Sequence, residues 1–190
     1  MRYTPLFIAA LILFSLSTRP AARAEPTLGE ASTVYLPFVS VPAPNIQTPE
    51  QYAMAQAVVA LVNSERVAVG CAPLTVNDKL VVAAQGQSQD MALNDFFSHT
   101  NPDPSRDTVG KRVIAAGYSS SFVGENIAAG YGTPAAVMAG WMRSPDHKKN
   151  MLNCAYTETG VGYYYQADDQ PLPGDSLAFY RYWTQDFGRP

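Results

Sequence analysis

The chain has 190 residues, 47% of them hydrophobic, and a formal net charge of −3, which is the composition of an ordinary globular protein. Three arginines and no acids lie in residues 1–24, so the net charge is −6 without that segment. A negative surface excludes proteins that bind nucleic acid or anionic membranes through clustered lysine and arginine. The basic pair Lys148–Lys149 is short and is typical of a solvated face.

Residues 1–24 have the pattern of a cleavable signal peptide. Arg2 supplies a positive start, Pro5–Leu16 is apolar but too short to span a bilayer as a mature helix, and Ala22–Ala24 has the small-x-small pattern that signal peptidase reads. We therefore predict cleavage after Ala24, a secreted extracellular protein, and no stable membrane span after processing. The alternative is an N-terminal membrane anchor that is never removed.

Residues 25–47 are rich in Pro, Ser, Thr and Ala, and we predict a linker there. Its apolar run Val34–Val39 would either add an edge strand or pack on the domain surface, and Pro37 limits its hydrogen bonding within a sheet. The folded domain is predicted to span residues 48–190, which is enough chain for one hydrophobic core.

Helix start signals recur along the first two thirds of the domain. Thr48, followed by Pro49 and by Gln51, predicts a helix with a capping box. Gly70 would stop this helix near residue 69. The apolar residues of its buried face are Ala55, Val58, Val59 and Val62.

Asn77 is predicted to cap a second helix over residues 78–94. The two prolines within residues 101–105 exclude regular structure, because each restricts the residue before it. A short helix over Val109–Ala116 follows, and Gly117 ends it.

A short strand is predicted over Ser119–Val123, and the segment Gly124–Ala128 leads away from it. Thr133–Pro134 repeats the cap-then-proline start of a helix. Ser144–Pro145 repeats it once more, and we predict that Ser144 caps a single turn that carries His147.

The last third of the chain changes from helical to strand-like patterns. Gly160–Tyr165 is predicted to be a strand, 167–175 a hairpin loop with two prolines, and Ser176–Phe187 a second strand with alternating faces. Helices first and strands last predict an α+β fold, in which helices cover an antiparallel sheet.

The chain has two cysteines, Cys71 and Cys154. In an exported protein such a pair predicts a disulfide. The bridge would close a loop of 83 residues, for which chain entropy gives a stabilisation of about 4–5 kcal/mol. In the rival interpretation, the two thiolates bind a metal with the two histidines. No Cys-x-x-Cys pair is present to support it.

Five short motifs occur in an order that resembles the CAP superfamily of cysteine-rich secretory, antigen 5 and plant pathogenesis-related proteins, in its short bacterial form. They are Phe97–Thr100, Gly124–Ala128, Trp141–Asn150, Gly160–Gly162 and Tyr182–Phe187. The resemblance covers roughly residues 50–187. It implies a three-layer α-β-α sandwich, secretion, and a cleft in which two histidines and two acidic residues face each other.

The cleft residues carry over in part. His99, Glu125 and His147 match the two histidines and one glutamate of the family. The family's other glutamate corresponds to Ser144 here, as in many bacterial members. The resemblance therefore implies a cleft of His99, Glu125, Ser144 and His147 with one acid instead of two.

The chain has only two histidines, and two converging neutral imidazoles form half of a zinc site or a site for another divalent metal. We predict His99 and His147 as ligands, with Glu125 either as a third ligand or as the hydrogen-bond partner that orients one imidazole. Such a site would be open to water and of modest affinity. In the alternative, the three side chains only hydrogen-bond one another and nearby loops.

Two catalytic alternatives remain. Ser144 and His147 could form a nucleophilic dyad that Glu125 orients, although no Gly-x-Ser-x-Gly elbow is present. Glu125 and Asp146 have the residue types of a glycosidase pair. A metal-assisted hydrolase of peptides or cell-wall material is a separate alternative function.

Aromatic residues near these motifs either line an apolar ligand groove or fill the core under the helices: Trp141, Tyr163–Tyr165 and Tyr180–Trp183. We expect a monomeric, secreted, non-catalytic protein that binds a small ligand in the His/Glu cleft. The resemblance suggests a lipid or sterol in an adjacent groove. An extracellular module that binds a protein partner is the third alternative.

Overall fold

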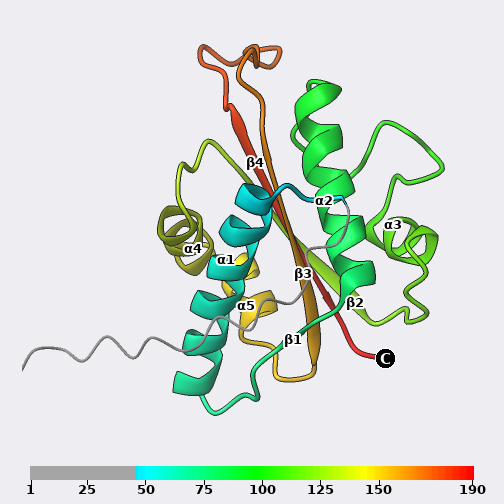
Figure 1. Cartoon of the computed structure of the whole chain (residues 1–190), viewed down its shortest axis with the longest axis vertical. Helices are drawn as coiled ribbons and strands as arrows, with labels where there is room; N and C mark the ends of the chain where they lie inside the picture. The colour runs from blue at the N-terminus through cyan, green and yellow to red at the C-terminus, as the bar shows by residue number, and fades with distance from the viewer. Residues whose placement is uncertain (1–45) are drawn as a thin grey trace, which may run out of the picture. The chain divides into compact units, whose positions relative to one another are not determined.

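The computed structural model describes residues 46–190 (Figure 1). The predicted signal peptide and all but the last two residues of the predicted linker lie outside the described residues. The last linker residue, Gln47, is buried, and its Nε2 donates to Gln85 Oε1 at 2.9 Å and to the Val161 carbonyl at 3.0 Å. No helix within 46–190 is long and apolar enough to cross a membrane.

All five predicted helix starts are confirmed. The helices of the described region are α1 (Pro49–Ala68), α2 (Asp78–Leu93), α3 (Val109–Ala115), α4 (Pro134–Arg143) and α5 (Pro145–Met151). The Thr48 hydroxyl accepts from the Gln51 amide while the Gln51 side chain accepts from the Thr48 amide, which completes the capping box. Asn77 and Thr133 cap α2 and α4, each by accepting from a backbone N–H of the first turn.

The prediction that Ser144 caps the next helix is confirmed for its position, the N-cap of α5, but not for its side chain. Ser144 lies in an extended conformation between α4 and α5, and its side chain makes no capping hydrogen bond. It instead lines a hollow beside His147. The following helix is also longer than the single turn predicted, because the seven residues of α5 make about two turns.

The described strands form one sheet in the order β1-β3-β4-β2. They are β1 (Thr75–Val76), β2 (Val123–Ala129), β3 (Glu158–Tyr165) and β4 (Arg181–Gly188). β4 pairs antiparallel with β2 and β3, whereas the short β1 pairs parallel with β3. The sheet is therefore antiparallel except at its β1 edge, and β2 is the opposite edge.

Two predicted strand positions need correction. The strand predicted over Ser119–Val123 is wrong, because the Gly124–Ala128 segment is itself the strand. It pairs with β4 along the whole of β2, and this pairing outweighs the low strand propensity of glycine and alanine. The last strand does not begin at Ser176 but at Arg181, because Tyr180 has a φ of 61°, in the left-handed region, and ends the preceding loop.

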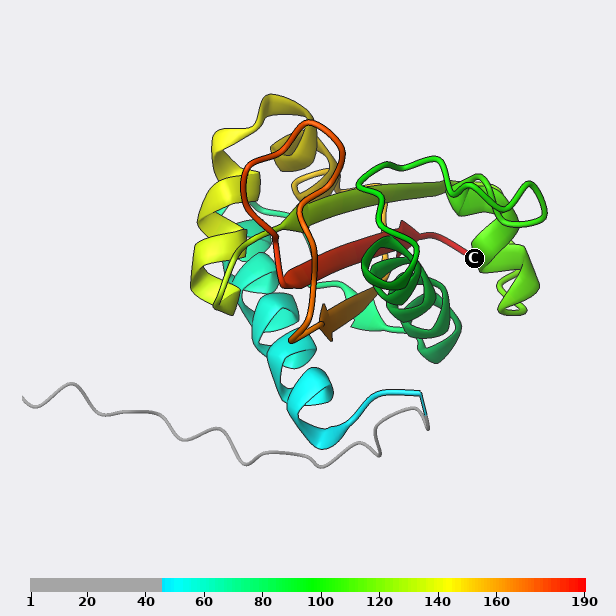
Figure 2. The same ribbon diagram turned by 90° about the horizontal axis from the view of Figure 1, so that it is seen from above.

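Helices cover both faces of the sheet, which confirms the predicted three-layer α-β-α sandwich. Figure 1 shows the sheet nearly edge-on, with α1, α4 and α5 on one side and α2 and α3 on the other. The view from above shows the same three layers (Figure 2). β4 is buried along nearly its whole length, because helices cover both faces of the sheet.

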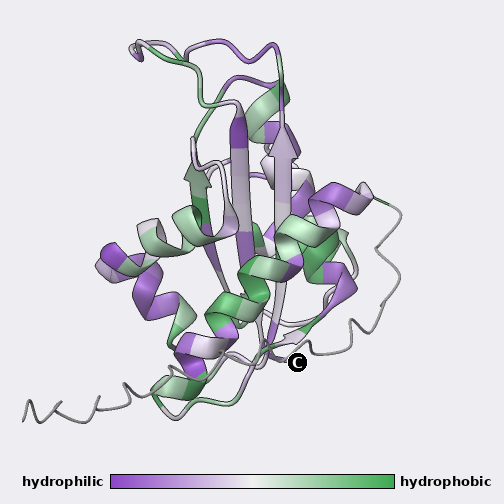
Figure 3. Cartoon of the chain, turned by 60° about the vertical axis from the view of Figure 1, so that its left-hand side comes forward, coloured by the Kyte–Doolittle hydropathy of each residue, from purple (hydrophilic) through white to green (hydrophobic). Residues whose placement is uncertain are grey.

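The layer that contains α1 encloses the larger core. Its fully buried members include Val58, Val62, Trp141, Trp183 and Phe187. Figure 3 shows the apolar middle of α1, coloured green, where the helix crosses the sheet. The predicted apolar face of this helix is therefore confirmed, and burial of these side chains is the main favourable contribution to packing on this side.

On the other face, α2 packs unusually close to β3. A Cβ atom added to Gly160 would overlap the backbone of Leu80 and Val81, and one added to Gly162 would overlap that of Ala84. The absence of these two side chains allows the helix backbone to lie directly on the strand.

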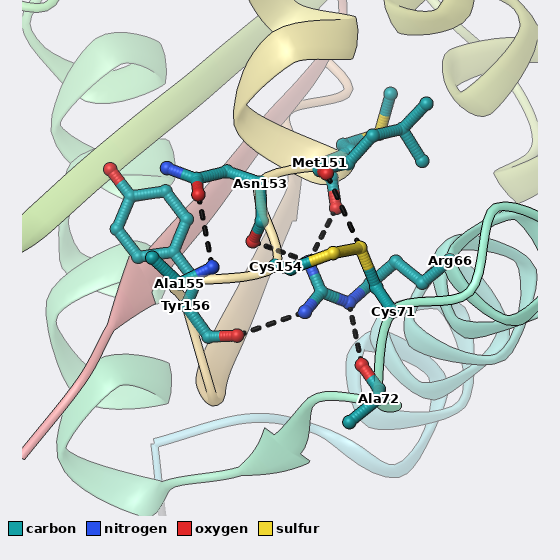
Figure 4. Close-up of a disulfide and its surroundings, with 9 residues drawn as sticks. Arg66, Cys71, Ala72, Met151, Asn153, Cys154, Ala155 and Tyr156 are labelled. Carbon is teal, nitrogen blue, oxygen red and sulfur yellow. Dashed lines mark hydrogen bonds between the residues drawn. A yellow bond between two sulfur atoms is a disulfide. The ribbon is translucent and has the colours of Figure 1, made fainter.

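The predicted disulfide is confirmed, and it lies beside a buried arginine (Figure 4). Cys71 and Cys154 are bonded with their Cα atoms 5.0 Å apart. The Arg66 side chain is completely buried and donates to the carbonyls of Ala72, Met151, Asn153 and Tyr156 at 2.7–3.0 Å. The bridge and the guanidinium together fix the end of α1 to the chain that follows α5.

Gly160→Ala should destabilise the fold by about 1–3 kcal/mol, because the new methyl group must push α2 away from β3. Urea unfolding of the variant and the parent measures this difference. Gly132→Ala is the matched control, because a Cβ at Gly132 would have open space around it. Equal stability of the two variants would contradict the close helix–strand packing.

Candidate functional site

Glu125 and His99 form the centre of the predicted cleft. Glu125 lies on the edge strand β2, and His99 lies in the loop after α2. His99 Nδ1 and Glu125 Oε1 are 2.7 Å apart. The Glu125 side chain is only 3% exposed, whereas that of His99 is 55% exposed. A carboxylate can only accept, so Nδ1 carries the hydrogen and Nε2 of a neutral imidazole is left as the acceptor or metal-binding nitrogen.

Arg112 is a site residue that the sequence interpretation missed. It lies on α3, and its NH2 group donates to Glu125 Oε2 at 2.6 Å. Its NH1 group donates to the carbonyls of His99 at 3.3 Å and Arg106 at 3.0 Å. Arg112 therefore neutralises Glu125 and ties the loop that carries His99 to α3. No motif marks it, and only its position beside the buried Val113 could have indicated an inward side chain.

Asp186 is the second residue that was missed. It lies on β4, directly opposite Glu125 in the β2–β4 pairing, and it is fully buried. Burial raises the pKa of the Asp186 carboxyl well above its usual range; the charge of Glu125 adds to this and Arg112 opposes it. The available sequence signal was that Asp186 is the one acid of the Tyr182–Phe187 motif, on a strand that helices were expected to cover.

His147 reaches the site from α5, which two asparagines attach to the edge strand. Asn126 Nδ2 donates to the His147 carbonyl at 3.1 Å. Asn150 Nδ2 donates to the Glu125 carbonyl at 3.2 Å and to Asn126 Oδ1 at 2.9 Å. The asparagines of the two predicted motifs thus hold His147 near the strand that carries Glu125.

The His147 imidazole is half-buried, and its pKa lies below the usual 6.5. Desolvation is the largest cause, the charge of the nearby His99 adds to it, and Asp146 partly opposes it. The imidazole is therefore neutral at physiological pH, the form that accepts a hydrogen bond or binds a metal.

An apolar hollow of about 320 Å³ adjoins His147, at the lower end of the range for small-molecule sites. Its wall includes Phe97, Ile127, Tyr131, Trp141, Ser144 and Phe179. The predicted ligand groove is therefore partly present: Trp141 lines it, whereas Tyr163, Tyr182 and Trp183 are buried in the core.

The loop between β3 and β4 provides one wall of this hollow through Phe179. The Phe179 ring lies 5.8 Å from that of Phe97. Buried Asp169 fixes the loop, because its carboxylate accepts from the Tyr180 amide at 2.7 Å and from the Tyr182 hydroxyl at 3.1 Å. The wall is thus a hydrogen-bonded part of the fold.

The arrangement gives little support to the catalytic alternatives. Within the described residues, no hydrogen bond joins Ser144 to His147, although both line the hollow. Glu125 is buried with both oxygens bonded, to His99 and to Arg112, so it is not placed as an open acid that could pair with the exposed Asp146.

The predicted three-ligand metal site fits the geometry poorly. Residues 46–190 contain no group of three or more His, Cys, Asp or Glu side chains placed to hold a metal ion. The carboxylate of Glu125 orients His99 through Nδ1 instead of pointing both oxygens at a shared ion. His99 and His147 remain as the two donors that could hold one, with Glu125 as the orienting partner.

The mixed sheet between two helical layers and the histidine–glutamate pair at its edge define an α-β-α sandwich with a His/Glu cleft. The cysteine-rich secretory protein family, CAP, matches residues 59–187, which is more than half of the chain. The chain therefore belongs to this family, as its five motifs predicted.

Individual relatives are similar over part of their length. Bacillus subtilis has an uncharacterized protein, YkwD, that is 40% identical over 109 residues, which are 56% of this chain and 40% of YkwD. An extracellular protein with an SCP domain from Bacillus anthracis has a TM-score of 0.62 and 29% identity, covering 76% of this chain and 44% of that one. An outer surface protein of Borrelia burgdorferi has the same fold, with a TM-score of 0.61 and 19% identity, covering 75% and 95%. The chain spans less than half the length of the curated relatives it matches.

His147 should titrate with a pKa below 6.5, and His99→Gln should raise it part of the way back, because burial is the larger cause and remains. The His147 Cε1–H resonance, followed by NMR as a function of pH, measures this pKa in the parent and in each variant. Asp146→Asn should move the pKa in the opposite direction, because Asp146 favours the charged imidazole.

The lowered pKa of His147 also determines how this residue makes the stability of the fold change with pH. The unfolded chain binds a proton at His147 more readily than the folded chain, so the contribution of His147 to the free energy of unfolding should fall as pH drops below about 6.5. A His147 pKa that is the same in the parent and in both variants would contradict the proximity of the three charges.

Proposed function

We propose that this chain is an exported protein whose CAP domain binds a small amphipathic ligand, with the apolar part in the hollow and the polar part at the imidazoles. The observation that carries the proposal is the apolar hollow of about 320 Å³ that adjoins the half-buried, neutral His147. Ligand sites commonly combine such apolar walls with a few fixed polar groups.

Export is supported by three independent features. Residues 1–24 have the composition of a signal peptide. The Cys71–Cys154 disulfide is typical of an oxidising compartment. The similar proteins of known structure include an extracellular protein and an outer surface protein.

The chemistry of the hollow favours a ligand with a short acyl chain or one apolar ring. Phe97, Trp141 and Phe179 provide aromatic walls, and Ile127 and Ala129 provide aliphatic ones. At the polar end, the neutral His147 imidazole can accept a hydrogen bond, and a protonated His99 would pair with an anionic head group. A small fatty acid combines both parts.

Ala129→Phe should weaken the binding of decanoate at least tenfold, because the new ring would occupy the hollow that Ala129 lines. Isothermal titration calorimetry of the processed protein measures the affinity. Ala60→Phe, on the exposed side of α1, is the matched control and should bind as the parent does. Failure of the parent to bind decanoate, or equal binding by Ala129→Phe, would overturn the proposal for this ligand class.

Metal binding is a second candidate function, and a specific contact favours it. The Glu125 carboxylate holds the Nδ1 hydrogen of His99, which is the arrangement that directs Nε2 toward a metal ion. His99 and His147 would hold a zinc ion, which would supply Lewis-acid character when bound. Metal-assisted hydrolysis of peptides or glycans would require this ion.

Zinc should bind the processed protein weakly, and His99→Ala and His147→Ala should each weaken binding at least tenfold. Glu125→Gln should have a smaller effect, because it removes only the orienting carboxylate. Calorimetric zinc titration tests both expectations. Undiminished zinc binding by both histidine variants, or none by the parent, would exclude a site at these residues. Peptide and glycan hydrolysis by the zinc-loaded parent would instead support the hydrolase alternative.

A further inference from the structure

The two buried carboxyl groups at the centre of the sheet, Glu125 and Asp186, face each other. They are directly paired residues of the antiparallel strands β2 and β4, so their side chains project from the same face. The charge of Glu125 acts on the Asp186 carboxyl and helps to raise its pKa. Neither has appreciable contact with solvent.

Within residues 46–190, Arg112 is the one guanidinium or ammonium group that balances this pair. Arg112 on α3 is ion-paired with Glu125, and it also acts on Asp186. β3 places Gly160 beside Asp186 and contributes no side chain. The charged residues of α2 lie near its two ends, away from the centre where it crosses the sheet: Asp78, Lys79 and Asp90.

The two acids differ in their hydrogen bonds. Glu125 accepts from the Arg112 guanidinium and from the His99 imidazole, and both contacts stabilise its anion. The two oxygens of Asp186 are buried and have no hydrogen-bond donor within the described residues. An ionised carboxylate in such surroundings is strongly disfavoured, whereas a protonated carboxyl can donate.

We propose that Asp186 keeps its proton in the folded protein and donates its O–H to the carboxylate of Glu125. Asp186 is therefore a positioning residue. It donates a third hydrogen bond to Glu125, so that Arg112, His99 and Asp186 together stabilise one carboxylate anion. The buried cluster then carries one negative and one positive charge, and His99 keeps its orientation without a second carboxylate charge beneath it.

Folding takes up this proton at neutral pH, because the same aspartate is ionised in the unfolded chain. Asp186 should therefore make the unfolding equilibrium constant rise with pH, by up to tenfold per pH unit, from the unfolded value near 3.8 up to the raised pKa of the folded state. Below about pH 6.5 this contribution opposes that of His147, so it is measured as the difference between the parent and an Asp186 variant. Loss of this proton would place two anions opposite each other with only Arg112 to balance them.

Asp186→Asn tests the proposal, because its amide can donate to Glu125 and has no proton to lose. We expect this variant to fold, to keep the His99 imidazole chemical shifts of the parent, and to lose up to a tenfold change per pH unit from the slope of its unfolding constant. Asp186→Ala, which has no donor, should instead change the His99 imidazole chemical shifts. Glu65→Gln, at an exposed acid of α1 away from the site, is the control and should keep the slope.

Isotope-edited infrared spectroscopy of the folded parent gives a second, independent measurement at pH 7. A protonated aspartic acid band should be present in the folded parent and should disappear on unfolding. An ionised Asp186 in this spectrum, or an unchanged slope in Asp186→Asn, would overturn the proposal. No ligand or metal enters either measurement, so failure of the proposed function would not affect the outcome.

Discussion

The architecture of the site depends on one carboxylate held at a fixed point of the edge strand. Glu125 contacts groups from three other parts of the chain: the His99 loop, Arg112 on α3 and Asp186 on β4. Because each contact is buried or half-buried, its geometry is set by the packing of those elements against the sheet. A shift of α3 or of the β2–β4 register would remove a donor from Glu125 and release His99. The stability of the fold and the orientation of the cleft histidine are therefore linked through the same side chain.

The motifs that identify the family mostly serve to dock elements on β2. Asn126 and Asn150 hydrogen-bond each other and join α5 to the strand. Asn150 also donates to the Glu125 carbonyl, a backbone group that an edge strand would otherwise leave open. Gly160 and Gly162 admit α2 against the opposite part of the sheet. The chemical groups left facing the cleft are few, chiefly the two imidazoles. This division explains how a chain can keep the family's motifs and carry Ser144 in place of one acid.

Local signals in the sequence predicted the local parts of the structure. The capping box of Thr48, the cap at Asn77 and the pairing of the two cysteines need only neighbouring residues or a count, and all three are confirmed. The position of β2 could not be predicted, because glycine and alanine have little strand propensity and the strand is defined by its partner β4. Arg112 and Asp186 were missed for a related reason. Their roles exist only where a short helix and a central strand converge on Glu125.

The position of the cleft at an edge strand gives it two chemically different sides. The α2–α3 side contains the charged cluster around Glu125, whereas the α4–α5 side contains Trp141 and the apolar hollow beside His147. A ligand with separate polar and apolar parts can contact both sides across β2 without crossing the core. A neutral Asp186 contributes to this separation, because a second anion beneath Glu125 would compete for Arg112 and weaken the hydrogen bond that orients His99. The buried proton and the amphipathic cleft thus follow from the same constraint: Arg112 can compensate only one negative charge at this edge of the sheet.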